Sequence, residues 1–257
     1  MTPLDMAHGA MSADPENAVA RMRFYDRLAD AELILLLERP AEGDTIVPRR
    51  FPLEDGPVVL AFDTEERLAS FAGPAPYAVI SGRALAGQLA GQGIGLGVNL
   101  DVAPSSFMIP ASALDWLADT LARGPVAEED RPTEVLAPSG LPETLLTALD
   151  SKLPAAAGLA DHALLAAVTY ASGRRGHLLS FVDPRPGAEA ALAQAVSEAL
   201  VFSGIEAGEL DVSFFAPSDP MLTRLARVAL RFDLPKPVVR RAPEGPGTDP
   251  NRPPMLR

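Results

Sequence analysis

Residues 56–82 of the chain read GPVVLAFDTEERLASFAGPAPYAVISG, and the fold can be worked out from this stretch. Gly56–Phe62 (GPVVLAF) is short and almost continuously apolar, which is typical of a buried strand. Asp63 and Glu66 then form an Asp-x-x-Glu pair, a variant of the capping box that opens a helix. Tyr77–Ser81 is another apolar run of strand length. The stretch therefore predicts strand, short helix and strand, the alternation of a mixed α/β layer.

The same alternation continues on both sides of this stretch. Further strands are expected at 31–38, 94–99, 106–109, 163–170, 178–182 and 210–215, with an edge strand at most within the proline-containing stretch 44–53. Helices are expected from Asp14, at 82–90, from Ser112, and at 142–152, 188–202 and 220–230, the last capped by Ser218. A short glycine-containing turn at 172–176 indicates a hairpin. The fold class is α/β (mixed α+β): two small domains, each a mixed sheet packed with helices.

The composition along the chain also predicts where the domains begin and end. Proline, glycine and the acidic run Glu128-Glu129-Asp130 interrupt all apolar periodicity between the two halves, which is typical of a solvated linker. The expected order is a flexible leader at 1–13, an α/β domain at 14–123, an acidic Pro/Gly linker at 124–138, a second α/β domain at 139–239, and a disordered proline-rich tail at 240–257.

The charge and the missing cysteines exclude several classes of function. The chain has 257 residues, with 22 basic and 34 acidic side chains and a net charge of −12. Nucleic-acid binding needs a concentrated basic face, so this balance argues against it. Without cysteine there is no disulfide, thiolate zinc site or cysteine nucleophile. Neither a secretory signal nor an apolar run of membrane-spanning length is present, so we expect a cytoplasmic protein with no membrane partner.

Two motifs invite a functional interpretation, and both are better explained structurally. The glycines of residues 91–97 (GQGIGLG) do not follow the dinucleotide spacing, and they leave a helix to enter a strand, which is the wrong order for that motif. A helix stop followed by closely packed strand backbone is the better interpretation. The three histidines, His8, His162 and His177, lack metal-ligand spacing. We therefore predict no cofactor, no metal and no catalytic residue.

Four residues remain as tentative contacts for a ligand or partner. Asp183 and Arg185 lie where a strand ends and a helix begins, which is where α/β proteins place ligand-binding residues. Arg174 and Arg175 lie on the predicted hairpin turn and could contact an acidic partner or an anion, as could Arg49-Arg50. Turn chemistry and ordinary surface charge are the competing explanations.

Four segments follow one another in a recognisable order: residues 24–28 (FYDRL), the step Phe62-Asp63-Thr64, Val79–Gly82 (VISG), and Val98-Asn99-Leu100. The order of these segments resembles the SseB family. In the family a Phe-Thr/Ser step and an Asn-Pro pair stand at two of these places, so Asp63 and Leu100 depart from the pattern. Residues 139–235 look like the C-terminal domain of the same family.

This resemblance implies a protein without an established catalytic activity, in a family named for enhanced serine sensitivity. It carries over no cofactor and no catalytic residue. We therefore expect a non-catalytic protein that binds a protein partner or a small metabolite, and that could form a homodimer. The alternative is an enzyme with an unrecognised carboxylate and arginine site around Asp183 and Arg185.

Overall fold

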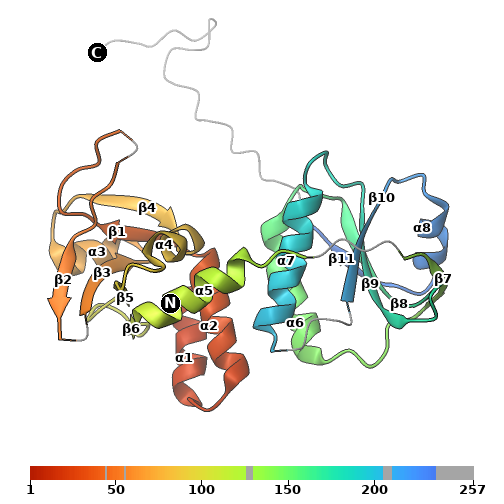
Figure 1. Ribbon diagram of the computed structural model, residues 1–257, viewed down its shortest axis with the longest axis horizontal. Helices are drawn as coiled ribbons and strands as arrows, with labels where there is room; N and C mark the ends of the chain where they lie inside the picture. The colour runs from red at the N-terminus through yellow and green to blue at the C-terminus, as the bar shows by residue number, and fades with distance from the viewer. Residues whose placement is uncertain (44, 55, 126–129, 205–209, 236–257) are drawn as a thin grey trace, which may run out of the picture.

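The computed structural model describes residues 1–43, 45–54, 56–125, 130–204 and 210–235, and it contains two separate sheets (Figure 1). Each sheet mixes parallel and antiparallel pairs and is packed with helices, which confirms the predicted fold class of two small α/β domains. The predicted tail at 240–257 and the acidic residues Glu128 and Glu129 lie outside the described residues.

The N-terminal domain is built from five helices and six strands. In chain order these are α1 (Pro3–Ala13), α2 (Ala18–Asp30), β1 (Glu32–Leu36), β2 (Arg50–Leu53), β3 (Gly56–Phe62), α3 (Glu65–Ala72), β4 (Tyr77–Ser81), α4 (Gly82–Leu89), β5 (Gly95–Val98), β6 (Phe107–Ile109) and α5 (Ala111–Ala122). The strand order is β4-β1-β3-β5-β6, with β2 also paired to β3. Only β3 and β5 run parallel among these pairs.

The strand side chains alternate between two apolar layers of unequal size. Leu33, Leu35 and Val59 face the layer formed by α1, α2, α4 and α5. Ile34, Leu36 and the other residues of the second layer pack against α3, through Leu68 and Ala72, and against loop residues such as Leu100. Because successive strand residues point to opposite faces, the continuous apolar run of β1 supplies both layers.

The C-terminal domain repeats this plan with different elements. They are β7 (Pro132–Leu136), α6 (Glu143–Lys152), the 3₁₀ turn η1 (Leu153–Ala156), β8 (His162–Tyr170), β9 (Arg175–Val182), α7 (Glu189–Phe202), β10 (Leu210–Phe215), α8 (Pro220–Leu225) and β11 (Leu230–Asp233). The strand order is β10-β9-β8-β11, with β7 also paired to β8, and β9 and β10 run parallel. Helices α6 and α7 cover one face, and α8 covers part of the other.

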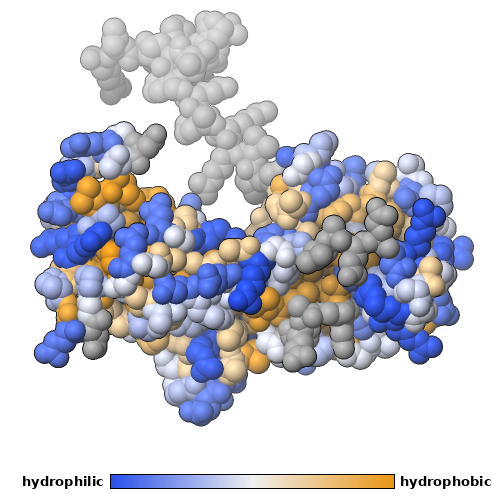
Figure 2. Space-filling view, viewed as in Figure 1, coloured by the Kyte–Doolittle hydropathy of each residue, from blue (hydrophilic) through white to orange (hydrophobic). Residues whose placement is uncertain are grey.

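The more heavily covered faces of the two sheets point toward each other. Figure 1 shows α2, α5, α6 and α7 between the two sheets, with α3 and α8 on the outer sides. The outer faces are therefore the thinly covered ones, and large apolar side chains such as Tyr77 and Val79 of β4 stay exposed. Figure 2 shows hydrophobic atoms reaching the surface of both domains among the charged residues.

The expected flexible leader at 1–13 is wrong. Residues Pro3–Ala13 form α1, which begins with a capping box between Thr2 and Asp5. Leu4 and Met11 of this helix are buried in the N-terminal core. Asp14 ends this helix instead of opening the next one, which Asn17 caps.

Several other boundaries also differ from the sequence prediction. Residues 132–136 of the expected linker form β7 on the edge of the second sheet. Three caps are wrong: Thr64 caps α3 in place of Asp63, Pro110 precedes α5 in place of Ser112, and Asp219 caps α8 in place of Ser218. Helix α8 ends at Leu225, and of the rest of the predicted helix 220–230 only Leu230 lies in β11.

The glycine-rich segment 91–97 has the structure predicted for it. Gly91 and Gly93 have φ values of 73° and 68°, and they turn the chain out of α4. Gly97 then lies in β5, where a Cβ would come within 2.6 Å of a Leu60 side-chain atom. The glycines are explained by the turn and by close packing between β5 and its neighbours.

A buried cluster of charges joins the two domains. Lys152 Nζ of α6 lies 2.8 Å from Asp26 Oδ1, 2.7 Å from Asp30 Oδ2 and 2.8 Å from Glu198 Oε2. The Lys152 side chain is 4% exposed and that of Glu198 is 3% exposed. Arg83 of α4 adds a fork to both Glu198 oxygens and a bond to Asp30. Because α2 and α4 belong to one domain and α6 and α7 to the other, these pairs cross the interface.

Apolar and hydrogen-bonding contacts continue the same interface. Phe202 of α7 is counted with the N-terminal core, and its ring meets that of Trp116 edge to face at 6.3 Å. Gln194 Nε2 donates to the carbonyl oxygen of Leu121 at 3.0 Å. The prediction that each half buries its apolar strands separately therefore holds for the strands, while the end of α7 is shared.

Across the described ranges, every helix is too short or too polar to traverse a lipid bilayer.

Gly82 lets α4 pack against the end of α2, and substituting it tests that contact. A Cβ at Gly82 would lie 1.8 Å from the carbonyl oxygen of Leu28, which is backbone and cannot turn away. We expect Gly82→Ala to lower the free energy of unfolding by about 3 kcal/mol or more. Gly87→Ala in the same helix meets no atom within 4 Å, so we expect it to stabilise by about 0.5–1 kcal/mol. Urea unfolding measures both; equal effects would contradict the packing argument.

Removing the shared cation tests the interface. Lys152→Met removes the ion pair of Asp26 and leaves Asp30 and Glu198 paired with Arg83, and breaking a buried pair in this way costs about 3–5 kcal/mol. We expect a lower urea midpoint. Arg231→Met removes an exposed pair with Asp233 and should change stability by less than about 1 kcal/mol. A Lys152→Met variant as stable as Arg231→Met would show that the cluster does not hold the domains.

Candidate functional site

The two sheets share one arrangement at their centres. In the N-terminal domain β1, β3 and β5 lie in that order, and in the C-terminal domain β8, β9 and β10 do. The first pair of each trio is antiparallel and the second pair is parallel. Each domain therefore has one place where the carboxyl ends of two parallel strands meet, and ligands of open α/β sheets bind outside such ends.

An aspartate follows the middle strand at both places. Asp63 comes directly after β3, and Asp183 comes directly after β9. The Asp63 amide donates to Asn99 Oδ1, at the end of β5, and the Asp183 amide donates to the carbonyl oxygen of Phe215, at the end of β10. Each aspartate is thus fixed across the end of its parallel pair. Asp183 also has a φ of 53°, in the left-handed region that few non-glycine residues adopt.

In the C-terminal domain this place is a pocket of about 300 Å³. It is lined by Asp161, His162, Leu164, Val182, Asp183, Pro217, Leu222 and Ala226. Most of the lining is aliphatic, and the polar side chains come from the ends of β8 and β9. An apolar body with a few polar groups is the ordinary composition of a small-molecule site.

The polar side chains that line this pocket are those of Asp161, His162 and Asp183. His162 Nδ1 lies 2.8 Å from Asp161 Oδ2, and Asp183 is exposed on the same rim. Two carboxylates and an imidazole beside aliphatic side chains favour a ligand that carries a positive charge on a small apolar body.

The structure brings Asp183 to this pocket but leaves the other three predicted residues outside it. Arg185 is exposed, and its amide donates to the carbonyl oxygen of Leu159. Arg174 and Arg175 lie at the opposite end of β9, because the hairpin turn precedes that strand. The constellation of Asp183, Arg185 and the arginine turn that sequence reasoning allowed is therefore not assembled.

Arg174 is engaged in contacts within the domain. Its guanidinium stacks 4.3 Å from the centre of the Tyr170 ring and donates to Asp211 Oδ2 at 2.8 Å. The Tyr170 hydroxyl donates to the same Asp211 oxygen at 2.5 Å. Burial and this bond raise the pKa of Tyr170. Arg175 is exposed beside this group, so of the arginine pair it is the one presented at the surface.

In the N-terminal domain the equivalent place is filled by α1. Arg67 of α3 donates to both oxygens of Asp5 at 3.0 and 2.6 Å, and to Asp63 Oδ1 at 2.7 Å. The Ser105 hydroxyl donates to Asp5 Oδ1 at 2.5 Å. Burial would raise the pKa of Asp5, but the bonds from Arg67 and Ser105 outweigh it and hold this pKa well below its usual range. A buried, ionised carboxylate thus occupies the end of β3 and β5.

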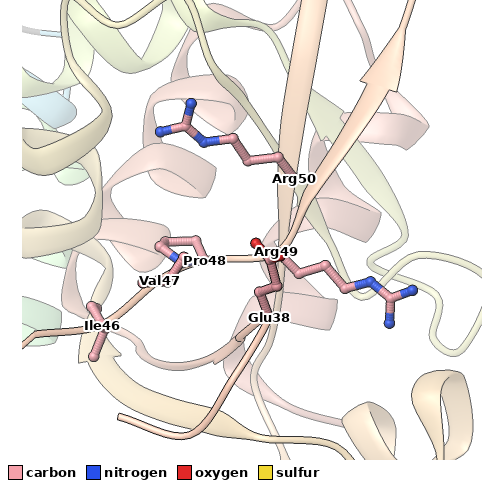
Figure 3. Close-up of a pocket in the computed structure, with 6 residues that line it drawn as sticks. All are labelled: Glu38, Ile46, Val47, Pro48, Arg49 and Arg50. Atoms are coloured by element: carbon pink, nitrogen blue, oxygen red, sulfur yellow. The ribbon is translucent and has the colours of Figure 1, made fainter. Parts of the chain in front are cut away.

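A second hollow lies on the connection between β1 and β2. It measures about 820 Å³ and is lined by Glu38, Ile46, Val47, Pro48, Arg49 and Arg50. Figure 3 shows the Arg49 and Arg50 side chains pointing to opposite sides of the chain. The Arg49 guanidinium lies 5.3 Å from the centre of the Phe51 ring. The two arginines therefore do not clamp one anion, as their sequence proximity suggested.

Among the residues that the structure describes, no three His, Asp or Glu side chains converge on a point that could hold a metal ion.

Apart from Asp183, sequence reasoning missed the functional residues at the two strand ends. Asp161 and His162 belong to the site because β8 begins where β9 ends, and that antiparallel register was implied by the predicted hairpin. Asp5 and Arg67 are 62 residues apart, and only the position of α1 brings them together. Leu4, His8 and Met11 carry the helical spacing that could have revealed α1.

The comparison with family models adds an independent finding. Residues 8–116 match the model described as the SseB protein N-terminal domain. This segment contains Asp63, Arg67, Asn99 and Ser105, while Thr2 and Asp5 precede it. Neither the curated proteins nor the solved structures yield a match to the chain.

The low pKa of Asp5 gives stability a defined pH dependence. The pKa of Asp5 is lower in the folded than in the unfolded chain. Such a carboxyl stabilises the folded state fully when the pH is above its unfolded pKa, near 3.9, and this stabilisation is lost as the pH falls. We expect Asp5→Asn to be destabilised at pH 7, and the gap to wild type in free energy of unfolding to narrow from about pH 5 downward. Urea unfolding between pH 2.5 and 7 measures this gap. For the exposed Asp233→Asn control we expect a small gap throughout; a constant gap for Asp5→Asn would contradict the assignment.

Proposed function

The chain belongs to the SseB family through its N-terminal domain, residues 8–116, and on the geometry above we propose that it is a non-catalytic ligand-binding protein. The ligand is a small organic cation, and its site is the pocket at the carboxyl ends of β9 and β10 in the C-terminal domain. The observation that carries this proposal is the position of Asp183, at the end of a parallel strand pair and on the rim of a pocket.

The shape and charge of the pocket support this ligand class. About 300 Å³ is at the lower limit for small-molecule sites, which favours a body of few heavy atoms. Leu164, Val182 and Leu222 offer aliphatic contact, and Asp161 and Asp183 offer acceptors for an ammonium group. The overall charge of −12 also favours the approach of cations.

The buried charges elsewhere support binding over acid–base catalysis. Lys152, Asp26 and Glu198 pair with one another at the domain interface. Arg67 and Asp5 pair at the end of β3. These groups serve to fix α1 and the two domains in place, and a rigid frame of this kind pre-organises a binding pocket.

A second candidate is an enzyme that uses the same pocket. The 2.8 Å contact between Asp161 Oδ2 and His162 Nδ1 is the geometry in which a carboxylate orients an imidazole for proton transfer. This candidate predicts that His162→Ala abolishes turnover of a bound ligand while leaving its affinity largely unchanged.

Parts of the sequence prediction go beyond the pocket and remain proposals. A protein partner at the exposed Arg175, a homodimer, and a cytoplasmic location are among them. So is the assignment of residues 139–235 to the SseB C-terminal domain, because the family match ends at residue 116.

A matched set of small ligands tests the proposed site. Isobutylamine, isobutanol and isobutyrate share one carbon body and differ in charge. We expect isobutylamine alone to shift the amide resonances of residues 161–162 and 182–183, with a dissociation constant in the millimolar range that suits so small a ligand. Asp183→Asn should weaken this binding about tenfold, because it removes a charge-assisted bond.

Arg185→Ala provides the matched control, since Arg185 lies two residues away and outside the pocket lining. We expect it to bind isobutylamine as the wild type does. Equal binding of all three ligands, or unchanged affinity in Asp183→Asn, would exclude the proposed cation site.

A further inference from the structure

At the carboxyl ends of β3 and β5 in the N-terminal domain, the Asp5 carboxylate is bound by side chains of other elements. The two Arg67 nitrogens donate to the two Asp5 oxygens, and the Ser105 hydroxyl donates to one of them. The Thr2 amide, from the helix itself, donates to the other at 2.8 Å. The Asp5 side chain is 1% exposed. This bidentate fork with an added hydroxyl is the arrangement by which arginine recognises carboxylates.

Most contacts that hold the receiving groups come from outside α1, although the hydroxyl of Thr2, which caps α1, also donates to Asp63 Oδ2 at 2.6 Å. Asn99 Nδ2 donates to the Ser105 oxygen at 2.9 Å, and both side chains are fully buried. The same Asn99 side chain accepts from the Asp63 amide, and Asp63 in turn orients Arg67. The fork and the hydroxyl therefore come from α3 and the loop after β5, while the α1 segment supplies the carboxylate and the two Thr2 bonds, one to Asp5 and one to Asp63.

The family match begins at residue 8, within α1. Asp63, Arg67, Asn99 and Ser105 lie inside residues 8–116, and Asp5 lies before them. The equivalent strand end of the C-terminal domain is an open pocket. The filled end thus has the place and the chemistry of a binding site, with a separate segment of the chain as its occupant.

We propose that the end of β3 and β5 is a carboxylate-binding site, that Asp5 of α1 occupies it within the chain, and that a free carboxylate ligand takes this place when α1 undocks. The ligand class is a carboxylate small enough to enter between Arg67 and Ser105. The site is in the other domain from the proposed cation pocket, so neither proposal depends on the other.

The first experiment empties the site in the full-length chain. Asp5→Ala removes the carboxylate and leaves Arg67 and Ser105 in place. Sodium acetate is the probe, with sodium chloride at the same ionic strength as its control. We expect acetate to raise the melting temperature of Asp5→Ala in a saturable way, by about 2–4 °C, and so to give a dissociation constant.

The control variant is Asp5→Ala combined with Arg67→Met, which removes the fork and should abolish the response to acetate. If Asp5→Ala does not fold in chloride, the same titration measures the recovery of folded signal. An acetate effect equal to that of chloride, or one that persists without Arg67, would overturn the proposal.

The second experiment asks whether a ligand replaces α1 in the wild-type chain. Acetate that binds only the undocked state multiplies the population of that state by one plus the ratio of its concentration to the dissociation constant. At four times the constant measured on Asp5→Ala, the amides of Leu4–Ala13 should exchange hydrogen about fivefold faster than in chloride. Amides of β8 should keep their rates.

Unchanged exchange in α1 under those conditions would show an internal salt bridge that no external ligand replaces, and would overturn the proposal even if Asp5→Ala responds to acetate. Faster exchange in α1 and β8 alike would show general destabilisation and would also overturn it.

Discussion

The Lys152 ammonium, held by three carboxylates from both domains, is the interaction on which the rest of the structure depends. Asp26 and Asp30 come from α2, and Glu198 comes from α7. Burying an ammonium group costs free energy unless acceptors surround it. Helices α2 and α7 must therefore keep their positions relative to α6. Burial would raise the pKa of Glu198, but the bonds from Arg83 and Lys152 lower it to about 2. The Glu198 carboxylate therefore stays ionised across the neutral range, whereas burial raises the pKa of Asp26.

The two domains share one strand arrangement, but different groups lie at the carboxyl ends of their parallel strands. Each places an aspartate after the middle strand, at the carboxyl end of its parallel pair. Around Asp183 the end remains a pocket, rimmed by carboxylates. Around Asp63 the partly buried Arg67 offsets the charge of the Asp63 carboxylate and also donates to Asp5. The two strand ends therefore differ in the groups around their aspartates, since Arg67 and Ser105 bind a carboxylate at one end and a histidine and a second aspartate line the other.

Local patterns were enough to predict most strands and most helices, although β7 and β11 were missed. Strand 210–215 agrees with its apolar pattern, and the hairpin at 172–176 joins the expected strands. The first helix was missed because its apolar positions are few and a polar, small-residue start resembles a flexible segment. Asp183 could be singled out from its place at a strand end. Lys152 pairs with Asp26, which is 126 residues away in the sequence. No local pattern predicts this pair, because any other helix with acidic residues could equally supply the partner of Lys152.

Calorimetry of the wild-type chain tests most directly whether the buried Lys152 ammonium couples the unfolding of the two domains. If the interface couples them, both sheets melt together, and the calorimetric enthalpy equals the van't Hoff enthalpy of a single transition. Two resolved transitions, or a calorimetric enthalpy near twice the van't Hoff value, would show that the sheets unfold separately and would contradict this coupling.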